Sequence, residues 1–187
     1  QDAGVIYEYY RRIDAGVDGP IILHDYPAAT GVSMPVELVL RLYGGLDNVK
    51  VIKLEETPSV PKVSALRDAG SDIAILGGLG GLFFLEELER GSNGIMTGFA
   101  YPDALVRVYQ AFEAGDLALA RDTFYSLAPL LRYEFQPSIG LALRKETYRL
   151  RGAIETSYVR HPGKQIDARL SSELANVVAH VWRDGAA

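Results

Sequence analysis

Short apolar runs alternate with amphipathic segments over the first part of the chain. In the amphipathic segments apolar side chains recur at three- and four-residue steps, which is typical of helices with one buried face. The runs between them are rich in aliphatic and β-branched residues and predict buried strands. The strands expected are Ile21–His24, Lys50–Leu54, Ile73–Leu76 and Gly94–Thr97, and the helices are Ala3–Gly16, one capped by Ser33 that runs to Gly44, one from Ser59 to Ala69, and Leu82–Arg90.

This alternation indicates right-handed βαβ crossovers and a parallel sheet covered on both faces. The pattern fits half of a (β/α)₈ barrel or a small, open, doubly wound sheet. From Tyr101 on the pattern is helical only. The helices expected there are Pro102–Ala114, Leu117–Tyr133 with Asp116 as N-cap, Ser138–Arg151 and Ser171–Trp182. No low-complexity segment or flexible linker interrupts the chain, so we expect one domain with a helical extension.

Composition narrows the classes of function. The chain has 187 residues, of which 48% are hydrophobic and 23% charged, as in an ordinary globular domain. A net charge of −5 without a Lys/Arg run argues against nucleic acid or an anionic membrane as a partner. The absence of cysteine excludes a disulfide framework and a cysteine nucleophile. It suits a reducing compartment, and with no membrane-spanning or signal-like segment in the sequence we expect a cytoplasmic protein.

Lys53 stands inside an apolar run. A strand places alternate side chains on opposite faces, so Val51 and Lys53 share one face while Ile52 and Leu54 share the other. Two explanations fit such a lysine: the strand ends there and the amine reaches water, or the amine is desolvated and serves as a nucleophile towards a carbonyl group. Spacing alone favours the solvated amine, because buried lysines are rare.

Four segments carry a resemblance to a known family. In chain order they read Ile-Leu-His-Asp-Tyr-Pro-Ala-Ala-Thr-Gly, Val-Ile-Lys-Leu-Glu-Glu, Ile-Leu-Gly-Gly and Gly-Ile-Met-Thr-Gly. Together they resemble the second half of the dihydrodipicolinate synthase and N-acetylneuraminate lyase superfamily, and the resemblance extends over nearly the whole chain. Members of this family are (β/α)₈ barrels in which a lysine on strand six forms a Schiff base with pyruvate or another 2-oxo acid.

The resemblance implies an α/β fold of the (β/α)₈ TIM-barrel type, of which this chain supplies strands five to eight and a C-terminal helical extension. Residues 1–100 would be the second half of the barrel, and residues 101–187 its last helix and the extension of the same domain. Lys53 takes the position of the Schiff-base lysine, so the nucleophilic explanation becomes the favoured one. The implied enzyme is a lyase, either aldolase or hydro-lyase, that needs no cofactor beyond the covalent lysine imine and works as a homo-oligomer, a dimer or tetramer.

Other residues follow from the same resemblance. His24 aligns with the family's proton-relaying tyrosine, and histidine gains and loses a proton near neutral pH. Tyr26 shares its face if the strand continues and is a second candidate proton carrier. The alternative is that His24 is a polar strand-end residue and Tyr26 a packing residue. The positions implied to bind the substrate are Thr30, Gly77, Gly78 and Met96, with the two glycines leaving room for it.

The sequence departs from the family at a position that selects the substrate. Ala29 replaces the arginine that holds the second substrate's carboxylate in the synthases, which argues against dihydrodipicolinate synthesis itself. For Glu55 and Glu56 the default expectation is that they face water. The alternatives are an ion pair with Lys53 or Lys50, or the orienting of a substrate hydroxyl group. The histidines are far apart in the sequence, so no metal site is predicted.

Two classes of function remain open at this point. The first is a Schiff-base lyase acting on a small 2-oxo acid. The second is a non-catalytic ligand-binding or regulatory relative that keeps the fold, motivated by His24 and Ala29; a weaker alternative is an enzyme that uses Gly77–Gly81 for an anion. Four strands alone would leave two open sheet edges, so we expect the 187 residues to be the carboxyl-terminal half of a protein of about 300 residues.

Overall fold

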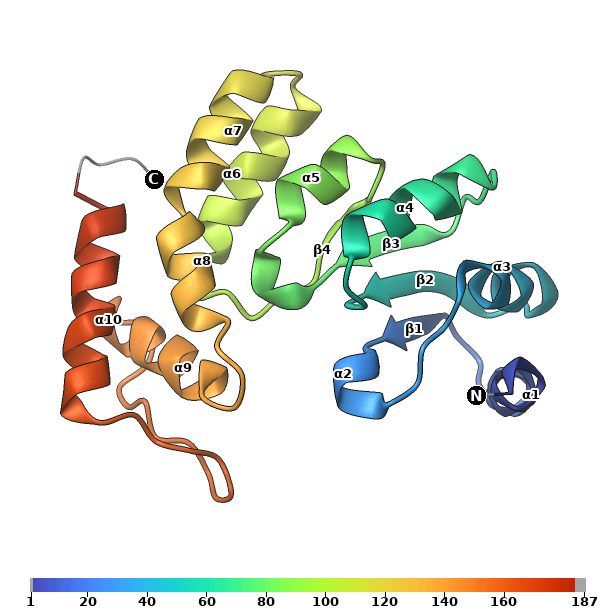
Figure 1. The fold of residues 1–187 in the computed structure, drawn as a ribbon, viewed down its shortest axis with the longest axis horizontal. Coiled ribbons are helices and arrows are strands. Elements are labelled where there is room, and N and C mark those ends of the chain that lie inside the picture. Colours follow the sequence, from blue (N-terminus) through green and yellow to red (C-terminus); the bar gives the residue numbers. More distant parts are fainter. Residues whose placement is uncertain (1, 184–187) are drawn as a thin grey trace. The chain divides into compact units, whose positions relative to one another are not determined.

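The computed structural model describes residues 2–183, which form two compact units. The first unit comprises the chain up to Gly78 together with Glu86–Met96, and it contains the parallel sheet (Figure 1). The second comprises Leu79–Leu85 and the chain from Thr97 onward, and it is helical. The predicted organisation, in which residues 101–187 extend the domain formed by residues 1–100, stays a prediction.

The first unit has the predicted alternation of strands and helices. Four parallel strands lie in the order β1-β2-β3-β4, so each strand pairs with the next one in the chain. The strands are β1 (Ile21–Asp25), β2 (Val49–Leu54), β3 (Ala74–Gly77) and β4 (Gly94–Ile95). The helices are α1 (Ala3–Asp14), α2 (Pro27–Thr30), α3 (Val36–Gly45), α4 (Ser59–Asp68) and most of α5 (Phe84–Glu89). The 3₁₀ turn η1 (Leu79–Gly81), which precedes α5 in the chain, belongs to the second unit. The α/β class is therefore confirmed.

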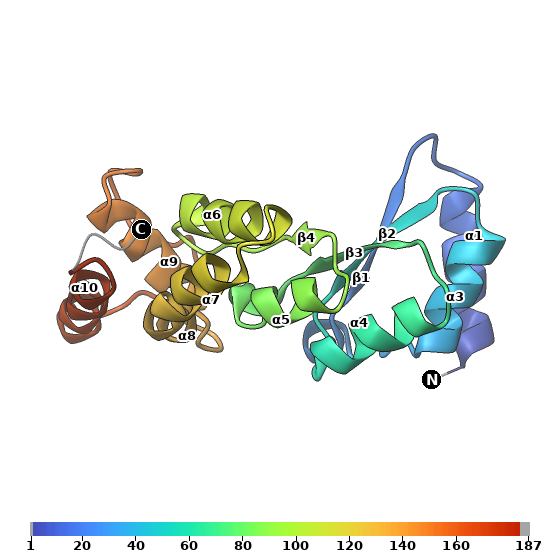
Figure 2. The ribbon, with the colours of Figure 1, turned by 90° about the horizontal axis from the view of Figure 1, so that it is seen from above.

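One face of the sheet is buried and the other is not. Leu23, Ile52, Leu54 and Ile75 point towards the helices and are 0% exposed. Figure 2 shows α3 and α4 along this side of the strands. The residues on the opposite face are partly or fully exposed: Ile22, His24, Val51, Lys53, Ala74 and Leu76. The prediction of a sheet covered on both faces is thus wrong for the described chain, and helices on one side favour a barrel segment over a doubly wound sheet.

Local differences from the predicted helices have physical causes. α2 was not expected; it begins at Pro27, whose ring fixes φ for a first helical turn. Ser33 does not cap α3, whose N-cap is Pro35, because the Ser33 hydroxyl donates a hydrogen bond to Glu56 instead. The single helix expected over Leu117–Tyr133 is two helices, since Pro129 lies in the first turn of the second and lacks an N–H to continue the first.

The second unit consists of η1 and the remaining helices. They are α6 (Pro102–Glu113), α7 (Leu117–Ser126), α8 (Ala128–Glu134), α9 (Gly140–Leu150) and α10 (Ala168–Val181). Asp116 caps α7 as predicted, by accepting the backbone N–H of Leu119, and Asp167 caps α10 in the same way. Buried Glu134 accepts the backbone N–H of Ala100, and burial raises its pKa to about 7. Across residues 2–183 no helix has the length and apolarity to cross a bilayer.

Glu87 is a buried carboxyl group on the covered side of the sheet. It is 1% exposed, and its Oε1 accepts a hydrogen bond of 2.6 Å from the Ser59 hydroxyl. A Cβ at Gly77 would lie 1.8 Å from Glu87 Oε2, so β3 accommodates this carboxyl because it ends in a glycine. Burial raises the pKa of Glu87 to about 7; the Ser59 hydrogen bond opposes the shift, and the charges of Glu86 and Glu55 add to it.

Replacing Glu87 with glutamine should remove a pH-dependent part of the stability. Because the pKa of Glu87 rises from 4.5 to about 7 on folding, its contribution is complete below pH 4.5 and is lost as the pH rises through about 7. Over that window the wild type should lose about 3 kcal/mol of unfolding free energy relative to Glu87→Gln, at about 1.4 kcal/mol per pKa unit. Urea unfolding across the window measures this difference.

Glu89→Gln removes an exposed carboxylate from the same helix and is the control. A difference between the wild type and Glu87→Gln that stays constant with pH would show that Glu87 does not titrate in this range.

Candidate active site

Lys53 and His24 lie side by side on neighbouring strands. In the parallel ladder His24 of β1 pairs with Lys53 of β2, which in turn pairs with Leu76 of β3. Residues paired in this way point to the same face, so both side chains project from the less buried face of the sheet. The Lys53 side chain is 19% exposed and that of His24 49%. The predicted faces are confirmed, because Ile52 and Leu54 are buried on the other side.

Glu55 connects the two side chains. His24 Nε2 lies 3.2 Å from Glu55 Oε2, and Lys53 Nζ lies 3.5 Å from Glu55 Oε1. The backbone N–H of Glu55 donates to the carbonyl oxygen of Asp25 at 2.8 Å, which carries the ladder one residue past β2 and turns the side chain towards His24. Glu55 is only 11% exposed in its side chain, so the expectation that it faces water is wrong. The alternative, an ion pair with Lys53, is what the structure has.

Tyr26 and Thr30 form the loop that follows β1. The Tyr26 ring stacks on His24, with ring centroids 5.6 Å apart and 20° between the planes. The strand ends at Asp25, so Tyr26 reaches His24 through the turn into α2 and not through strand alternation. The Thr30 hydroxyl donates to the carbonyl oxygen of Tyr26 at 3.0 Å and accepts the N–H of Val32 at 3.1 Å. These bonds fix the loop beside the site.

Gly77, the last residue of β3, and Gly78, the residue after it, both lie against side chains of the protein. A Cβ at Gly78 would lie 2.1 Å from Glu55 Oε1, and the space at Gly77 is filled by Glu87 on the covered face. Each glycine makes room for a carboxyl group of the protein, and the prediction that the two glycines also leave room for a substrate stays a prediction. Met96 follows β4, is 39% exposed, and its N–H donates to the Gly77 carbonyl oxygen at 2.9 Å.

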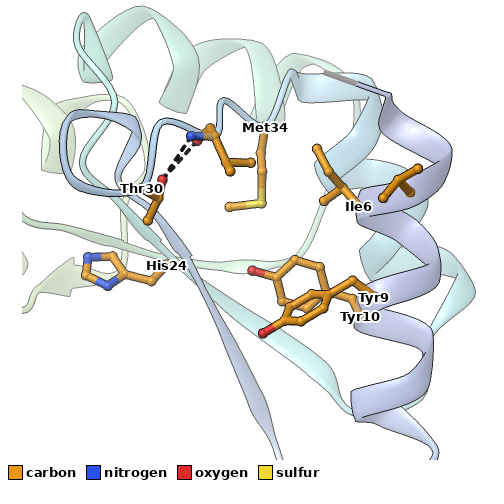
Figure 3. A pocket seen from close by; sticks show the side chains of 8 residues that line it. Ile6, Tyr9, Tyr10, His24, Thr30 and Met34 are labelled. Atoms are coloured by element: carbon orange, nitrogen blue, oxygen red, sulfur yellow. Dashed lines mark hydrogen bonds between the residues drawn. The ribbon is translucent and has the colours of Figure 1, made fainter.

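A pocket of about 420 Å³ lies beside His24. Figure 3 shows that Tyr9 and Tyr10 reach it from α1, whereas His24, Thr30 and Met34 come from β1 and the segment after it. Its lining is mostly apolar, and His24 and Thr30 are polar groups on one side. Two of the predicted site residues thus share this pocket, while the described residues that line it do not include Lys53, Gly77, Gly78 or Met96.

The arrangement brings a primary amine, a carboxylate and an imidazole together at one end of two strands. A lysine amine can attack a carbonyl carbon, and a carboxylate in contact with a histidine can accept and return protons. Sequence reasoning missed the central position of Glu55; the signal was its place two residues beyond Lys53, which puts it on the same side as Lys53 if the ladder continues. Within residues 2–183, no three His, Asp or Glu side chains group as metal ligands would.

Comparison with known proteins defines the class. A parallel α/β sheet with reactive side chains at the carboxyl ends of its strands is typical of α/β enzymes. The profile of the Dihydrodipicolinate synthetase family matches residues 2–181, and the chain belongs to this family.

Individual relatives agree with this assignment. The chain is 29% identical over 174 residues to L-2-keto-3-deoxyarabonate dehydratase of Azospirillum brasilense, covering 90% of this chain and 55% of the relative. It is 32% identical over 151 residues to 4-hydroxy-tetrahydrodipicolinate synthase of Methanothrix thermoacetophila, covering 79% and 50%. The crystal structure of dihydrodipicolinate synthase from Rhodopseudomonas palustris superposes with a TM-score of 0.91 at 32% identity, covering 96% and 62%. The chain thus spans about half the length of the curated relatives it matches.

A methyl group at Gly78 should dismantle the contacts of Glu55. The added Cβ of Gly78→Ala would lie 2.1 Å from Glu55 Oε1 and 2.3 Å from its Cγ, so the carboxylate must move. We expect a crystal structure of this variant to show Glu55 beyond hydrogen-bond reach of His24. Gly44→Ala in α3 is the matched control, because a Cβ there meets nothing within 4 Å. A Glu55–His24 contact retained in Gly78→Ala would contradict the packing described above.

Proposed function

We propose that this chain is part of a Schiff-base lyase that acts on pyruvate or another 2-oxo acid, with Lys53 as the nucleophile. The observation that carries the proposal is the contact of Glu55 with both Lys53 and His24 at the carboxyl ends of β1 and β2. Membership of the family supports it, since a dehydratase and synthases are among the relatives. In this assignment β1 to β4 are strands five to eight of a (β/α)₈ barrel.

The first chemical step would be the formation of an imine on Lys53. The ammonium group first loses a proton to solvent, which the 19% exposure of the Lys53 side chain allows. The neutral amine then attacks the 2-oxo carbon, and the resulting carbinolamine takes up a proton from solvent and loses its hydroxyl group as water, which gives a protonated imine. No cofactor is required, because the imine itself withdraws electrons from the neighbouring carbon. The positive charge of the imine would remain beside the Glu55 carboxylate.

The second step would use the Glu55–His24 pair. The Glu55 carboxylate removes a proton from the carbon next to the imine, and the electron pair moves into an enamine. If the following carbon bears a hydroxyl group, that C–O bond breaks and the departing hydroxide takes a proton from His24; if a C–C bond breaks, the reaction is an aldol cleavage and the proton transfers run in a different order. The likeness to a keto-deoxy sugar acid dehydratase favours the dehydration. Tyr26, stacked on His24, would hold the ring in place.

Other residues would surround the bound substrate. Thr30, whose hydroxyl fixes the loop beside His24, and Met96 would border the bound substrate, whereas Ala29 offers no charge for a second carboxylate. Assembly as a homo-oligomer and a cytoplasmic location stay predictions.

Borohydride trapping with pyruvate tests the nucleophile. Reduction converts the imine into a stable secondary amine, so the full-length protein incubated with pyruvate and borohydride should carry an adduct on the Lys53 peptide, detected by mass spectrometry. Lys53→Met should abolish the adduct. Lys50→Met is the control, because Lys50 is an exposed lysine on the same strand. Ligand-induced stabilisation without any adduct, over a range of 2-oxo acids, would instead favour a non-catalytic relative.

Glu55→Gln tests the proton carrier separately from the nucleophile. The amide keeps the size of the side chain but cannot take a proton, so kcat should fall by about 10²- to 10⁴-fold while borohydride trapping on Lys53 persists. Steady-state kinetics on a hydroxylated 2-oxo acid that the wild type turns over gives the comparison, with Glu37→Gln on the exposed face of α3 as the control. Full turnover in Glu55→Gln would remove Glu55 from the mechanism.

A further inference from the structure

A second lysine lies behind the candidate site, on the covered side of the sheet. Lys62 of α4 has a side-chain exposure of 8%. Its Nζ lies 2.6 Å from three oxygen atoms: Asp25 Oδ2, Glu56 Oε2 and the backbone carbonyl oxygen of Met34. An ammonium group has three N–H donors, so this one is fully used. We call these four residues the Lys62 cluster.

The three acceptors belong to three different segments of the first unit. Asp25 is the last residue of β1, Glu56 lies in the connection from β2 to α4, and Met34 lies in the loop between α2 and α3. Ser33 adds a fourth link, since its hydroxyl donates to Glu56. Sequence reasoning expected Glu56 to face water, and this is wrong: its side chain is 24% exposed and bound on both oxygens.

Each acidic member of the cluster is the chain neighbour of a site residue. Asp25 follows His24, and Glu56 follows Glu55. Neighbouring side chains of extended backbone point to opposite sides, so the site residues face one side of the sheet while their neighbours reach Lys62 on the other. The two segments also meet directly through the bond from Glu55 N–H to the Asp25 carbonyl oxygen. Movement of either segment would change the 3.2 Å separation of His24 and Glu55.

Electrostatic attraction holds the residues of the Lys62 cluster together. Asp25 is 0% exposed, and burial raises its pKa more than the Lys62 hydrogen bond lowers it. For Glu56, burial raises the pKa but the hydrogen bonds from Lys62 and Ser33 outweigh it, so its pKa is lowered. Because a buried ammonium without partners is costly, Lys62 holds its acceptors together and the segments with them.

We propose that Lys62 is a positioning residue: through Asp25 and Glu56 it sets the distance between His24 and Glu55 and thereby the rate of proton transfer. This rests on the proposed function, in which that pair moves protons. Lys53 is held by the backbone ladder of β2 and not by the cluster. Loosening the cluster should therefore slow turnover without affecting imine formation.

Glu56→Ala in the full-length protein is the main test. It releases the β2–α4 connection while Lys62 and Asp25 remain a balanced pair, so the fold should persist. We expect kcat to fall about tenfold or more, while KM stays within about threefold of the wild-type value. The reason is that small displacements of catalytic groups lower the reaction rate strongly. The rate of borohydride trapping on Lys53 should equal that of the wild type. Glu37→Ala on α3 is the control, since it removes an exposed glutamate outside the cluster.

The double variant Asp25→Asn/Lys62→Met is the second test. It removes the buried charges of Asp25 and Lys62 together and all three hydrogen bonds of the Lys62 ammonium group, and it should lower kcat at least as far as Glu56→Ala with trapping unchanged. If the double variant does not fold, Glu56→Ala alone tests the positioning role of Lys62. Wild-type kcat in Glu56→Ala, or a loss of trapping parallel to the loss of kcat, overturns the positioning role.

Failure of the proposed function gives a different result. If the wild type traps no 2-oxo acid, the lyase assignment fails, and the cluster is judged from crystal structures of the same variants. A His24–Glu55 separation unchanged in Glu56→Ala then overturns the inference as well, and a lengthened one supports it.

Discussion

The two-residue period of the parallel strands is the constraint on which the rest of the structure depends. Ile52 and Leu54 must be buried under the helices, and the residue between them is forced to the other face. The register of the ladder then places His24 beside Lys53 on that face. A shift of one residue would send the lysine into the apolar core and two aliphatic side chains to the exposed face, so packing of the covered side fixes the geometry of the candidate site.

The same alternation gives two consecutive glutamates opposite roles. Glu55 turns to the face of Lys53 and His24, and Glu56 turns to Lys62. Each is buried where a neighbour leaves space or supplies charge: the absence of a side chain at Gly78 admits Glu55, and the Lys62 ammonium compensates Glu56. The two consecutive glutamates after β2 therefore belong to different groups of residues: Glu55 to the candidate active site and Glu56 to the Lys62 cluster.

Sequence patterns predicted the helices and strands better than they predicted the environment of individual side chains. The strands around Ile52 and Ile75 follow from aliphatic runs, and the N-cap at Asp116 follows from local chemistry. The sequence did not reveal that helices would cover only one face, because that depends on how successive crossovers lie relative to the sheet. Nor could it show that Gly77 faces Glu87 across ten positions of the chain, since a glycine is compatible with a ligand, a backbone or a side chain in the space it leaves.

Burial alone would select Lys62 and not Lys53. Lys53 places an ammonium group in an apolar strand, yet Lys62, at 8% side-chain exposure, is more buried than Lys53 at 19%. The difference lies in the acceptors. Lys62 has three oxygens at 2.6 Å and no donor left for chemistry, whereas the ion-pair partner of Lys53 within the described residues is Glu55 at 3.5 Å. A lysine that can give up its proton and form a new bond needs incomplete coordination and access to solvent, and of these two lysines Lys53 is the less coordinated and the more exposed.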